Sequence, residues 1–302
     1  MKISILTATY NREKCLNKLY NSIVKNTKYK VFLEWLIMDD GSVDNTKQVV
    51  QSFISESSKN EYLEIKYFQQ KNQGKMSAIN NLIQFVSDST LLIECDSDDY
   101  FTDDAIKIIY EKYKTIDEND LYALCFLKED EHLCNIGSVF KKENHKTKMF
   151  DLYYKEGIEG DKTLVFFTKI RKMYSYPLEG NEKFCTEARM YNKMDKKYNI
   201  KCFNKPILIC KYLKEGYSKN INKIFITNPF GYYEYFKELL QFSMKGVLLR
   251  KRLYILKHYI LFSNLTKQKH ILKPVNNVLN KIFITVLWLP GKLKTNIWQK
   301  KL

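Results

Sequence analysis

Blocks of apolar and polar residues alternate along the first hundred positions. Short apolar, β-prone runs predict four strands, over residues 2–7, 34–38, 63–68 and 91–95. Between them, apolar residues recur at helical spacing and predict three helices, over 16–24, 46–54 and 79–86. Asn11 is expected to cap the first helix, and Asp44 or Thr46 to begin the second. Strands and helices that alternate at this spacing are typical of βαβ units, so we expect an α/β fold with a mostly parallel sheet.

The pattern changes after residue 120. Further strands are expected over 121–127, 137–140, 164–168 and 206–210, with one helix over 182–194. From residue 219 onward the spacing predicts only helices, over 232–243, about 246–262 and about 270–289. We therefore expect an α+β second half packed on the parallel first half, followed by a helical C-terminal region.

Polar clusters follow each of the first four predicted strands. They are Thr9-Tyr10-Asn11, Asp39-Asp40, Asn72–Lys75 and Asp96–Asp99. Each cluster alone is also the ordinary sequence of a turn or a helix cap. Ligands of open parallel sheets bind beyond the carboxyl ends of the strands. Four clusters at one edge therefore favour a binding site.

The acidic cluster after the fourth strand has the pattern of a metal site. In an extended segment Asp96 and Asp98 point the same way, and their mutual repulsion is relieved by a cation between them. Oxygen ligands beside phosphate favour Mg²⁺ or Mn²⁺. Asp39 and Asp40 could accept hydrogen bonds from a base or a ribose, and Lys75 could meet a phosphate. A solvated acidic turn is the alternative interpretation of Asp96–Asp99.

Composition and charge exclude several classes of protein. Ten glycines and five prolines in 302 residues exclude collagen-like and low-complexity chains, and the seven cysteines, an odd number without metal-ligand spacing, are expected to be reduced thiols. We expect neither a signal peptide nor a transmembrane span. Residues 1–218 carry 34 Lys and Arg against 32 Asp and Glu, whereas residues 219–302 carry 16 against two. The net charge of +16 therefore belongs almost entirely to the C-terminal region.

Taken in order, these blocks resemble a known family. "ISILTATYNREKCLNKLYNSI", "WLIMDDGSVDNT", "QKNQGKMSAIN" and "LLIECDSDDYF" are similar to the family 2 glycosyltransferases of the GT-A fold. Downstream, "GDKTLVFFTKI" and "YPLEGNEKFCTEARMYNKM" resemble the acceptor-side segment of bacterial members. The resemblance implies a catalytic domain over 1–218, with a nucleotide-sugar half over 1–100 and an acceptor half over 101–218, and a separate basic region over 219–302.

The resemblance also implies roles for individual residues. Thr9, Tyr10 and Asn11 would line the nucleotide, with Tyr10 against the base. Asp40 would read the uracil ring of a UDP-sugar with Asp39 beside it, and Lys75 would approach the donor. Asp96 would meet the ribose and Asp98 the metal, Mn²⁺ or Mg²⁺, while Asp99 could take either part.

An inverting member of this family needs a carboxylate to take the proton of the acceptor hydroxyl. The candidates for this base are Glu179, Glu182 and Glu187. Glu182 is the first choice because it directly precedes Lys183-Phe184, although the segment has one residue more than many relatives. Glu187 would either act as the base or position the acceptor. The alternative is that these are first-turn helix acids.

The expected function is transfer of a hexosyl or N-acetylhexosaminyl group from a nucleotide sugar to a glycan or lipid-linked acceptor in bacterial surface polysaccharide synthesis. The rival interpretations are a nucleotidyltransferase and a non-catalytic basic scaffold with a GT-A body. The basic region 219–302, with Trp288 and Trp298, favours peripheral contact with an anionic membrane at the inner face of the plasma membrane. No nucleic-acid module is recognisable. An oligomer is compatible with the sequence.

Overall fold

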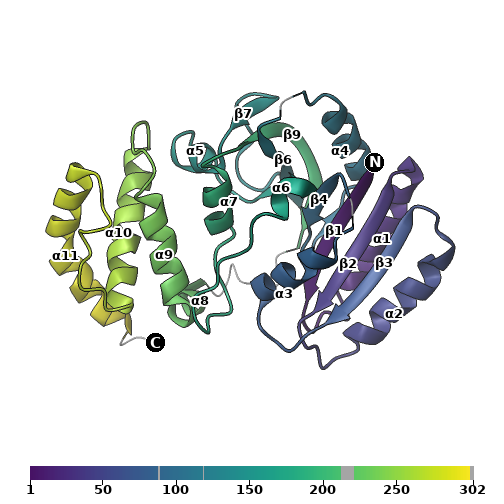
Figure 1. Cartoon of the computed structure of the whole chain (residues 1–302), viewed down its shortest axis with the longest axis horizontal. Helices are drawn as coiled ribbons and strands as arrows, with labels where there is room; N and C mark the ends of the chain where they lie inside the picture. The colour runs from purple at the N-terminus through teal and green to yellow at the C-terminus, as the bar shows by residue number, and fades with distance from the viewer. Residues whose placement is uncertain (88, 118, 212–220, 300–302) are drawn as a thin grey trace. The chain divides into compact units, whose positions relative to one another are not determined.

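A computed structural model describes residues 1–302 apart from 88, 118, 212–220 and 300–302, and for 289–299 it describes the backbone alone. The strands are β1 (Lys2–Thr9), β2 (Phe32–Asp39), β3 (Leu63–Gln69), β4 (Leu91–Glu94), β5 (Tyr100–Phe101), β6 (Leu121–Asp130), β7 (His145–Thr147), β8 (Lys162–Phe167) and β9 (Asn199–Cys210). The helices are α1 (Leu16–Asn26), α2 (Thr46–Glu56), α3 (Lys75–Leu82), α4 (Ala105–Lys114), α5 (Met149–Tyr154), α6 (Thr168–Arg171), α7 (Ala188–Met194), α8 (Ile221–Thr227), α9 (Pro229–Leu239), α10 (Leu249–Leu265) and α11 (Val278–Gln299). Figure 1 labels these elements.

The chain forms two compact units that are interleaved in the sequence. The first comprises residues 1–148, 158–175 and 196–216, and the second comprises 149–157, 176–195 and 217–302. The acceptor half expected over 101–218 is therefore divided between them. Segment 176–195, which contains the candidate bases, folds with the C-terminal helices, so a single boundary near residue 218 does not describe the chain.

One mixed sheet organises the first unit. Its strand order is β3-β2-β1-β4-β8-β6-β9-β5, with β7 paired to β9. Strands β1, β2, β3, β4, β6 and β9 run in one direction, and β5, β7 and β8 run in the other. Figure 1 shows the four parallel strands β3, β2, β1 and β4 side by side. The expected α/β class and the first four strands are confirmed.

The buried core explains why these segments form the sheet. Alternate residues of β1 and β2 pack against α1, α2 and α4. Trp35 is fully buried there and lies 6.1 Å, between ring centroids, from Phe53 of α2, which stacks on Tyr20 of α1 at 4.1 Å. Helix α3 lies against β1 and β2. Burial on both faces accounts for strands that are almost continuously apolar in sequence.

Three local expectations were wrong. Residues 137–140 form a loop because Gly137 packs against the 159–160 backbone, where a Cβ would lie 2.1 Å from the Glu159 oxygen. The helix expected over 182–194 begins only at Ala188. Asn11 does not cap α1, which begins at Leu16; it adopts φ of 52° and bonds to the loop after β2.

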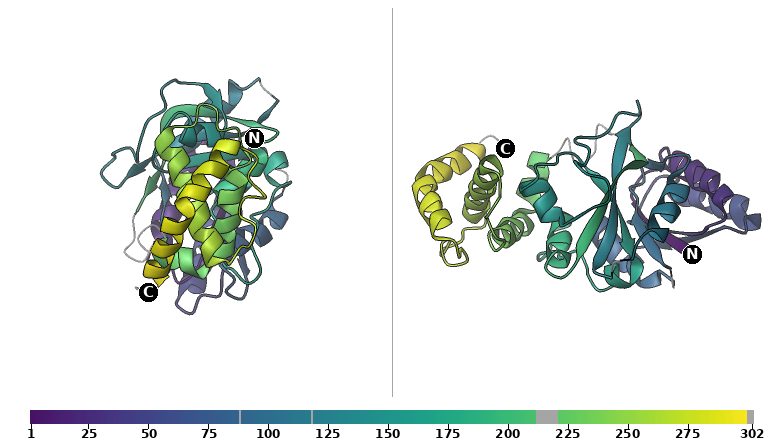
Figure 2. Two further views of the ribbon diagram at one scale, coloured as in Figure 1. Left: turned by 90° about the vertical axis from the view of Figure 1, so that its left-hand side faces the viewer. Right: turned by 90° about the horizontal axis from the view of Figure 1, so that it is seen from above.

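The second unit has its own aromatic core. Helix α10 packs against both α9 and α11, as Figure 2 shows. Phe150 and Tyr154 of α5 share this core with Phe236 and Phe262. Trp288 packs at its margin, and the side chain of Trp298 lies outside the described residues. Among the described residues, no helix is long and apolar enough to cross a membrane.

Candidate functional site

The carboxyl ends of the parallel strands meet at one edge of the first unit, as the sequence predicts. Thr9 at the end of β1 is in register with Asp39 at the end of β2, which in turn is in register with Gln69 of β3. Beyond β4, the Cys95 N–H donates to the Leu6 carbonyl of β1 at 2.9 Å. The register therefore places the four polar clusters together at this edge.

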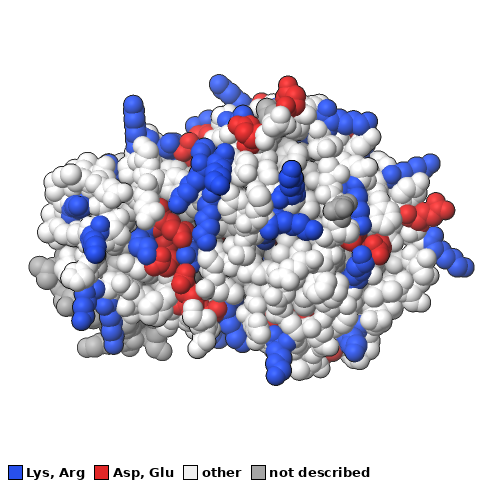
Figure 3. Space-filling model, in the orientation of Figure 1, with Lys and Arg blue, Asp and Glu red and all other residues white. Residues whose placement is uncertain are grey.

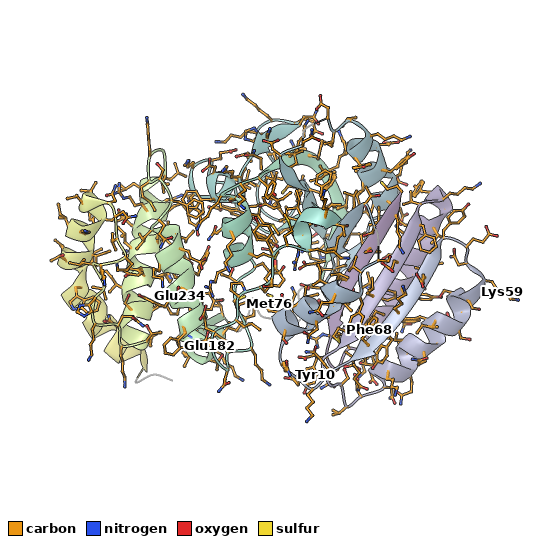
Figure 4. All side chains as sticks on the ribbon, in the orientation of Figure 1. Tyr10, Lys59, Phe68, Met76, Glu182 and Glu234 are labelled. Atoms are coloured by element: carbon orange, nitrogen blue, oxygen red, sulfur yellow. The ribbon has the colours of Figure 1, made fainter. Side chains whose placement is uncertain are left out.

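The cluster after β1 presents a buried hydroxyl and an exposed ring. Oγ1 of Thr9 is buried and has no hydrogen-bond partner among the described residues. Tyr10 is 45% exposed and is labelled in Figure 4. Asn11 is bonded to the loop after β2, because its N–H donates to Ser42 Oγ and its Oδ1 accepts from the Val43 N–H, each at 2.9 Å. A buried hydroxyl without a partner can still bond to a ligand or a water, and a half-exposed ring offers a flat surface for stacking.

Asp39 is engaged by the protein on both carboxylate oxygens. Its Oδ1 accepts the Ser42 N–H at 2.7 Å, and its Oδ2 accepts the hydroxyl of Tyr67 at 2.6 Å. The side chain is fully buried. Burial and the Asp39 charge together raise the pKa of Tyr67. Asp39 therefore fixes the turn after β2.

Asp40 holds the loop that leads into α3. Its Oδ1 accepts from Gln70 Nε2 at 2.7 Å and from the Gln73 N–H at 2.8 Å, and its Oδ2 accepts the Gly74 N–H at 2.8 Å. Gly74 has φ of 92°, a conformation that a residue with a Cβ rarely adopts. This buried carboxylate therefore shapes the backbone directly before Lys75, and its remaining lone pairs can accept further hydrogen bonds.

The acidic turn after β4 is paired with two lysines. Lys75 Nζ lies 2.6 Å from Asp96 Oδ1, and Lys128 Nζ lies 3.3 Å from Asp99 Oδ2. Enclosure by protein opposes ionisation of Asp96, but Lys75 and Lys128 outweigh it, so that its pKa is lowered. Burial, reinforced by Asp96 and Asp99, raises the pKa of Asp98 from 3.8 to about 6. Asp98 is thus the acid of this turn whose charge is least compensated.

Sequence reasoning missed two members of this cluster. Lys128 extends from β6, and Cys210 at the end of β9 donates its thiol to Asp99 Oδ2 at 3.2 Å. The thiol pKa is raised by burial, which makes Cys210 a neutral donor. Lys128 directly follows the apolar run of β6, as the other polar clusters follow their strands, which was the available signal, but its partner follows only from the sheet topology.

The residues present fit a divalent cation that is bound partly by these carboxylates and partly by a phosphate of the substrate. Asp98 and Asp99 offer carboxylate oxygens, and repulsion within the turn favours a positive charge there. Among the described residues, no group of three or more His, Cys, Asp or Glu side chains could hold a metal alone. Mg²⁺ is commonly held by one or two carboxylates together with substrate phosphates, which matches this donor set.

In the second unit, Glu182 binds the start of a helix. Its Oε1 accepts the Phe230 N–H and its Oε2 the Gly231 N–H, both at 2.7 Å, in the first turn of α9. Figure 4 labels Glu182. Burial raises its pKa, although these two hydrogen bonds oppose the shift. A carboxylate with a raised pKa is a better proton acceptor when ionised, and it retains two lone-pair sites here.

The other two candidate bases lie nearby in the same unit. Glu179 accepts from Arg189 Nη1 at 3.0 Å, and Arg189 also bonds to Glu238 of α9 at 2.9 Å. Glu187 accepts the hydroxyl of Tyr191 at 3.1 Å. Arg189 thus links α9 to the segment that precedes α7. Its direct salt bridge neutralises the charge of Glu179, one of the three candidate bases.

The chain matches a family model and several known proteins. A family model described as glycosyl transferase family 2 matches residues 4–172. "Uncharacterized glycosyltransferase MG060" of Mycoplasma genitalium is 37% identical over 118 residues, which are 37% of this chain and 37% of the relative. "Poly(ribitol-phosphate) beta-N-acetylglucosaminyltransferase TarS" of Staphylococcus aureus is 31% identical over 108 residues, 35% of this chain and 18% of the relative. The aligned segments therefore span well under half of the curated relatives.

Solved structures share the fold over the whole chain. S. aureus TarS 1–349 in complex with UDP-GlcNAc matches with a TM-score of 0.54 at 15% identity, covering 100% of this chain and 92% of that one. The mannosyltransferase PcManGT of Pyrobaculum calidifontis, in complex with GDP-Man and Mn²⁺, matches with a TM-score of 0.53 at 13% identity, covering 98% and 84%. Identities this low establish the fold alone.

Proposed function

The chain belongs to glycosyltransferase family 2, and from this premise we propose that it transfers a sugar from a UDP-sugar to a hydroxyl of a glycan or lipid-linked acceptor in bacterial surface polysaccharide synthesis. TarS, a relative by sequence and by fold, is a β-N-acetylglucosaminyltransferase whose structure includes a UDP-GlcNAc complex. An N-acetylhexosaminyl or hexosyl donor is therefore proposed for this chain. The observation that carries the proposal is the edge where Thr9, Asp40 and the acidic turn Asp96–Asp99 converge.

The donor is proposed to lie along this edge. Tyr10 would stack on the base, and Thr9 would supply its orphaned hydroxyl. Asp39 and Asp40 would hold the loops that surround the uracil, with a remaining lone pair of Asp40 directed to the ring. Asn11 fixes the turn that carries Tyr10. Lys75 and Asp96 would meet the diphosphate and the ribose.

Asp98 and Asp99 are the proposed ligands of Mn²⁺ or Mg²⁺. A divalent cation bound there would neutralise charge on the leaving diphosphate. Lys128 and Cys210 hold Asp99 in place by a salt bridge and a hydrogen bond. Lys75 is close enough to Asp96 to exchange that carboxylate for a phosphate oxygen as the donor binds.

The reaction is proposed to be a single in-line displacement with inversion. The acceptor oxygen forms a bond to the anomeric carbon as the bond from that carbon to the diphosphate oxygen breaks, and UDP leaves with the electron pair. A carboxylate removes the acceptor proton, since the hydroxyl pKa is far above neutrality. We assign this role to Glu182, with Glu187 positioning the acceptor.

The test is donor binding and turnover with defined variants. UDP should bind more tightly with Mn²⁺ than with chelator, and incubation with a UDP-sugar should release UDP slowly even without acceptor. Asp98→Asn and Asp99→Asn should each abolish the metal dependence of UDP binding and of UDP release. Asp103 is an exposed acid in the next turn, and Asp103→Asn should leave both unchanged. Release of pyrophosphate from UTP in the presence of a sugar 1-phosphate, with no release of UDP from the UDP-sugar, would identify a nucleotidyltransferase, and absence of nucleotide binding would favour a scaffold.

A further inference from the structure

Helix α11 has an apolar buried face and, next to it, an apolar exposed face. Its inner face packs in the aromatic core of the second unit through Phe283, Ile284 and Leu287. Its outer face exposes four aliphatic side chains, here called the α11 stripe: Val278 (70% exposed), Leu279 (47%), Ile282 (55%) and Val286 (68%). At about 100° per residue these four positions fall within one side of the helix. By the same spacing Lys281 and Thr285 fall on a third, polar side of the helix, and a contiguous exposed apolar patch beside a polar one marks an interaction site.

The charged residues of the C-terminal region around the stripe are all basic after residue 238. Residues 239–302 include 13 Lys and Arg and no Asp or Glu. The two acids of the region 219–302 lie on α9 and are engaged, Glu234 with Lys237 and Glu238 with Arg189. On the face drawn in Figure 3, basic side chains and no acidic ones lie over α10 and α11. Whatever covers the stripe therefore meets an uncompensated positive field.

These observations select among possible occupants. A second copy of the chain, paired through the same face, would bring two strongly basic regions together. A protein partner would typically be anchored by Trp, Tyr or Arg, whereas the stripe offers only Val, Leu and Ile. Aliphatic side chains next to lysines are the composition of helices that lie in the interface of anionic lipids.

We infer that the α11 stripe docks the enzyme on an anionic lipid surface, with α11 lying in the plane of the interface. The lysines would attract the lipid headgroups, and the stripe would insert among the acyl chains. The inference concerns where the enzyme works rather than what it transfers, so it is tested apart from the glycosyl transfer. Attraction by Lys and Arg is screened by salt, while insertion is not, so both contributions can be measured.

The experiment measures binding of the full chain to vesicles of phosphatidylcholine with and without 30 mol% phosphatidylglycerol. We expect the chain to sediment with the anionic vesicles and to bind neutral ones at least about tenfold less tightly. Ile282→Asp/Val286→Asp should weaken binding to anionic vesicles by about tenfold or more. The matched control Leu133→Asp/Val139→Asp has the same change of charge at exposed aliphatic positions of the first unit (66% and 50% exposed) and should bind like the wild type.

Further variants separate insertion from charge. Ile282→Ser/Val286→Ser should also lose affinity, although its charge is unchanged. The proposal fails if the wild type does not bind anionic vesicles at low salt, or if both stripe variants bind as well as the wild type. It fails also if the stripe variants turn an oligomer into a monomer, measured by light scattering, while vesicle binding persists, because the stripe is then a subunit interface. UDP affinity in solution should be equal in all variants. A loss of vesicle binding with unchanged UDP affinity is therefore distinguishable from failure of the proposed function, in which the protein would not bind UDP.

Discussion

Nζ of Lys75 lies 2.6 Å from Oδ1 of Asp96, so the first residue of α3 is joined to the first acid after β4. The salt bridge links two of the polar clusters that the sequence placed at one edge. Since Asp40 fixes the backbone at Gly74, the lysine is delivered to this position by a buried hydrogen-bond network. The pair therefore depends on the correct folding of both loops of the proposed donor site.

Lys75 should contribute directly to the binding of UDP. Lys75→Ala should raise the Kd for UDP about tenfold, because one charge-assisted contact to the diphosphate, worth about 1.4 kcal/mol, is lost. Titration calorimetry in the presence of Mn²⁺ measures the effect. Lys71→Ala, which removes an exposed lysine of the same loop, is the control and should leave the Kd unchanged. Equal losses in both variants would mean that the loop acts only through its general charge.

The buried pair of Lys128 and Asp99 should be essential for stability. Lys128→Met leaves the Asp99 carboxylate, which is 8% exposed, without its cation, and should reduce the free energy of unfolding by about 3–5 kcal/mol. Adding Asp99→Asn should restore part of this loss. The surface pair of Lys112 and Glu143 offers a control, since Lys112→Met should cost less than about 1 kcal/mol. Urea unfolding of the four proteins is the measurement, and a loss below about 1 kcal/mol in Lys128→Met would contradict the assignment.

Acid stability should depend on Glu34, a fully buried carboxylate of β2. Burial opposes its ionisation, but hydrogen bonds from Ser4, Lys66 and Ser87, together with the charge of Lys2, lower its pKa from 4.5 to about 2. Because the folded-state pKa is depressed, the stabilisation is complete above about pH 4.5 and is lost as the pH falls through about 2.

The corresponding variant is Glu34→Gln. It should be less stable than the wild type by about 3 kcal/mol at pH 7, and the difference should shrink between pH 4.5 and pH 2. Thermal unfolding over this range measures it. Glu64→Gln is the control, because Glu64 is paired with the same Lys66 but is 44% exposed. A pH-independent difference would show that packing rather than ionisation is lost.

Glu182 should have two separable effects. Glu182→Gln keeps the shape of the side chain but has one acceptor oxygen, so one of the two α9 hydrogen bonds is lost at a cost of about 1 kcal/mol. If Glu182 is the base, transfer should fall by about 10²–10⁴ while the Kd for the donor is unchanged. Glu187→Gln is the comparison. Transfer at the wild-type rate in Glu182→Gln would leave this residue as a helix cap only and would move the search to Glu187.

The sequence predicted which residues lie together where polar side chains directly follow a strand. Asp39 and Asp96 each occur within two residues of a buried strand end, and the register of parallel strands then brings them to one edge. It was uninformative where the partner comes from a distant segment. Cys210 contacts Asp99 across 111 positions, through a pairing of β5 with β9 that no local pattern encodes.

Helix prediction failed at residues 182–187 for a related reason. The segment has helical spacing, but the carboxylate of Glu182 is bound to the backbone of α9 rather than to its own segment. Phe184 also packs against the aromatic core of the C-terminal helices. These contacts, which lie some 48 residues away in sequence, outweigh the local helical preference.

The interleaving of the two units has a consequence for synthesis on the ribosome. The core that holds Phe150 and Phe184 includes α9, α10 and α11, so it cannot close until the last part of the chain has emerged. Until then, α5 and the segment around Glu182 leave the exit tunnel with apolar side chains uncovered, while the strands of the first unit can already pair. Nascent chains halted when residues 1–218 have just emerged from the tunnel should therefore resist protease in the sheet but be cut within 149–157 and 176–195, and they should recruit chaperones at those two segments.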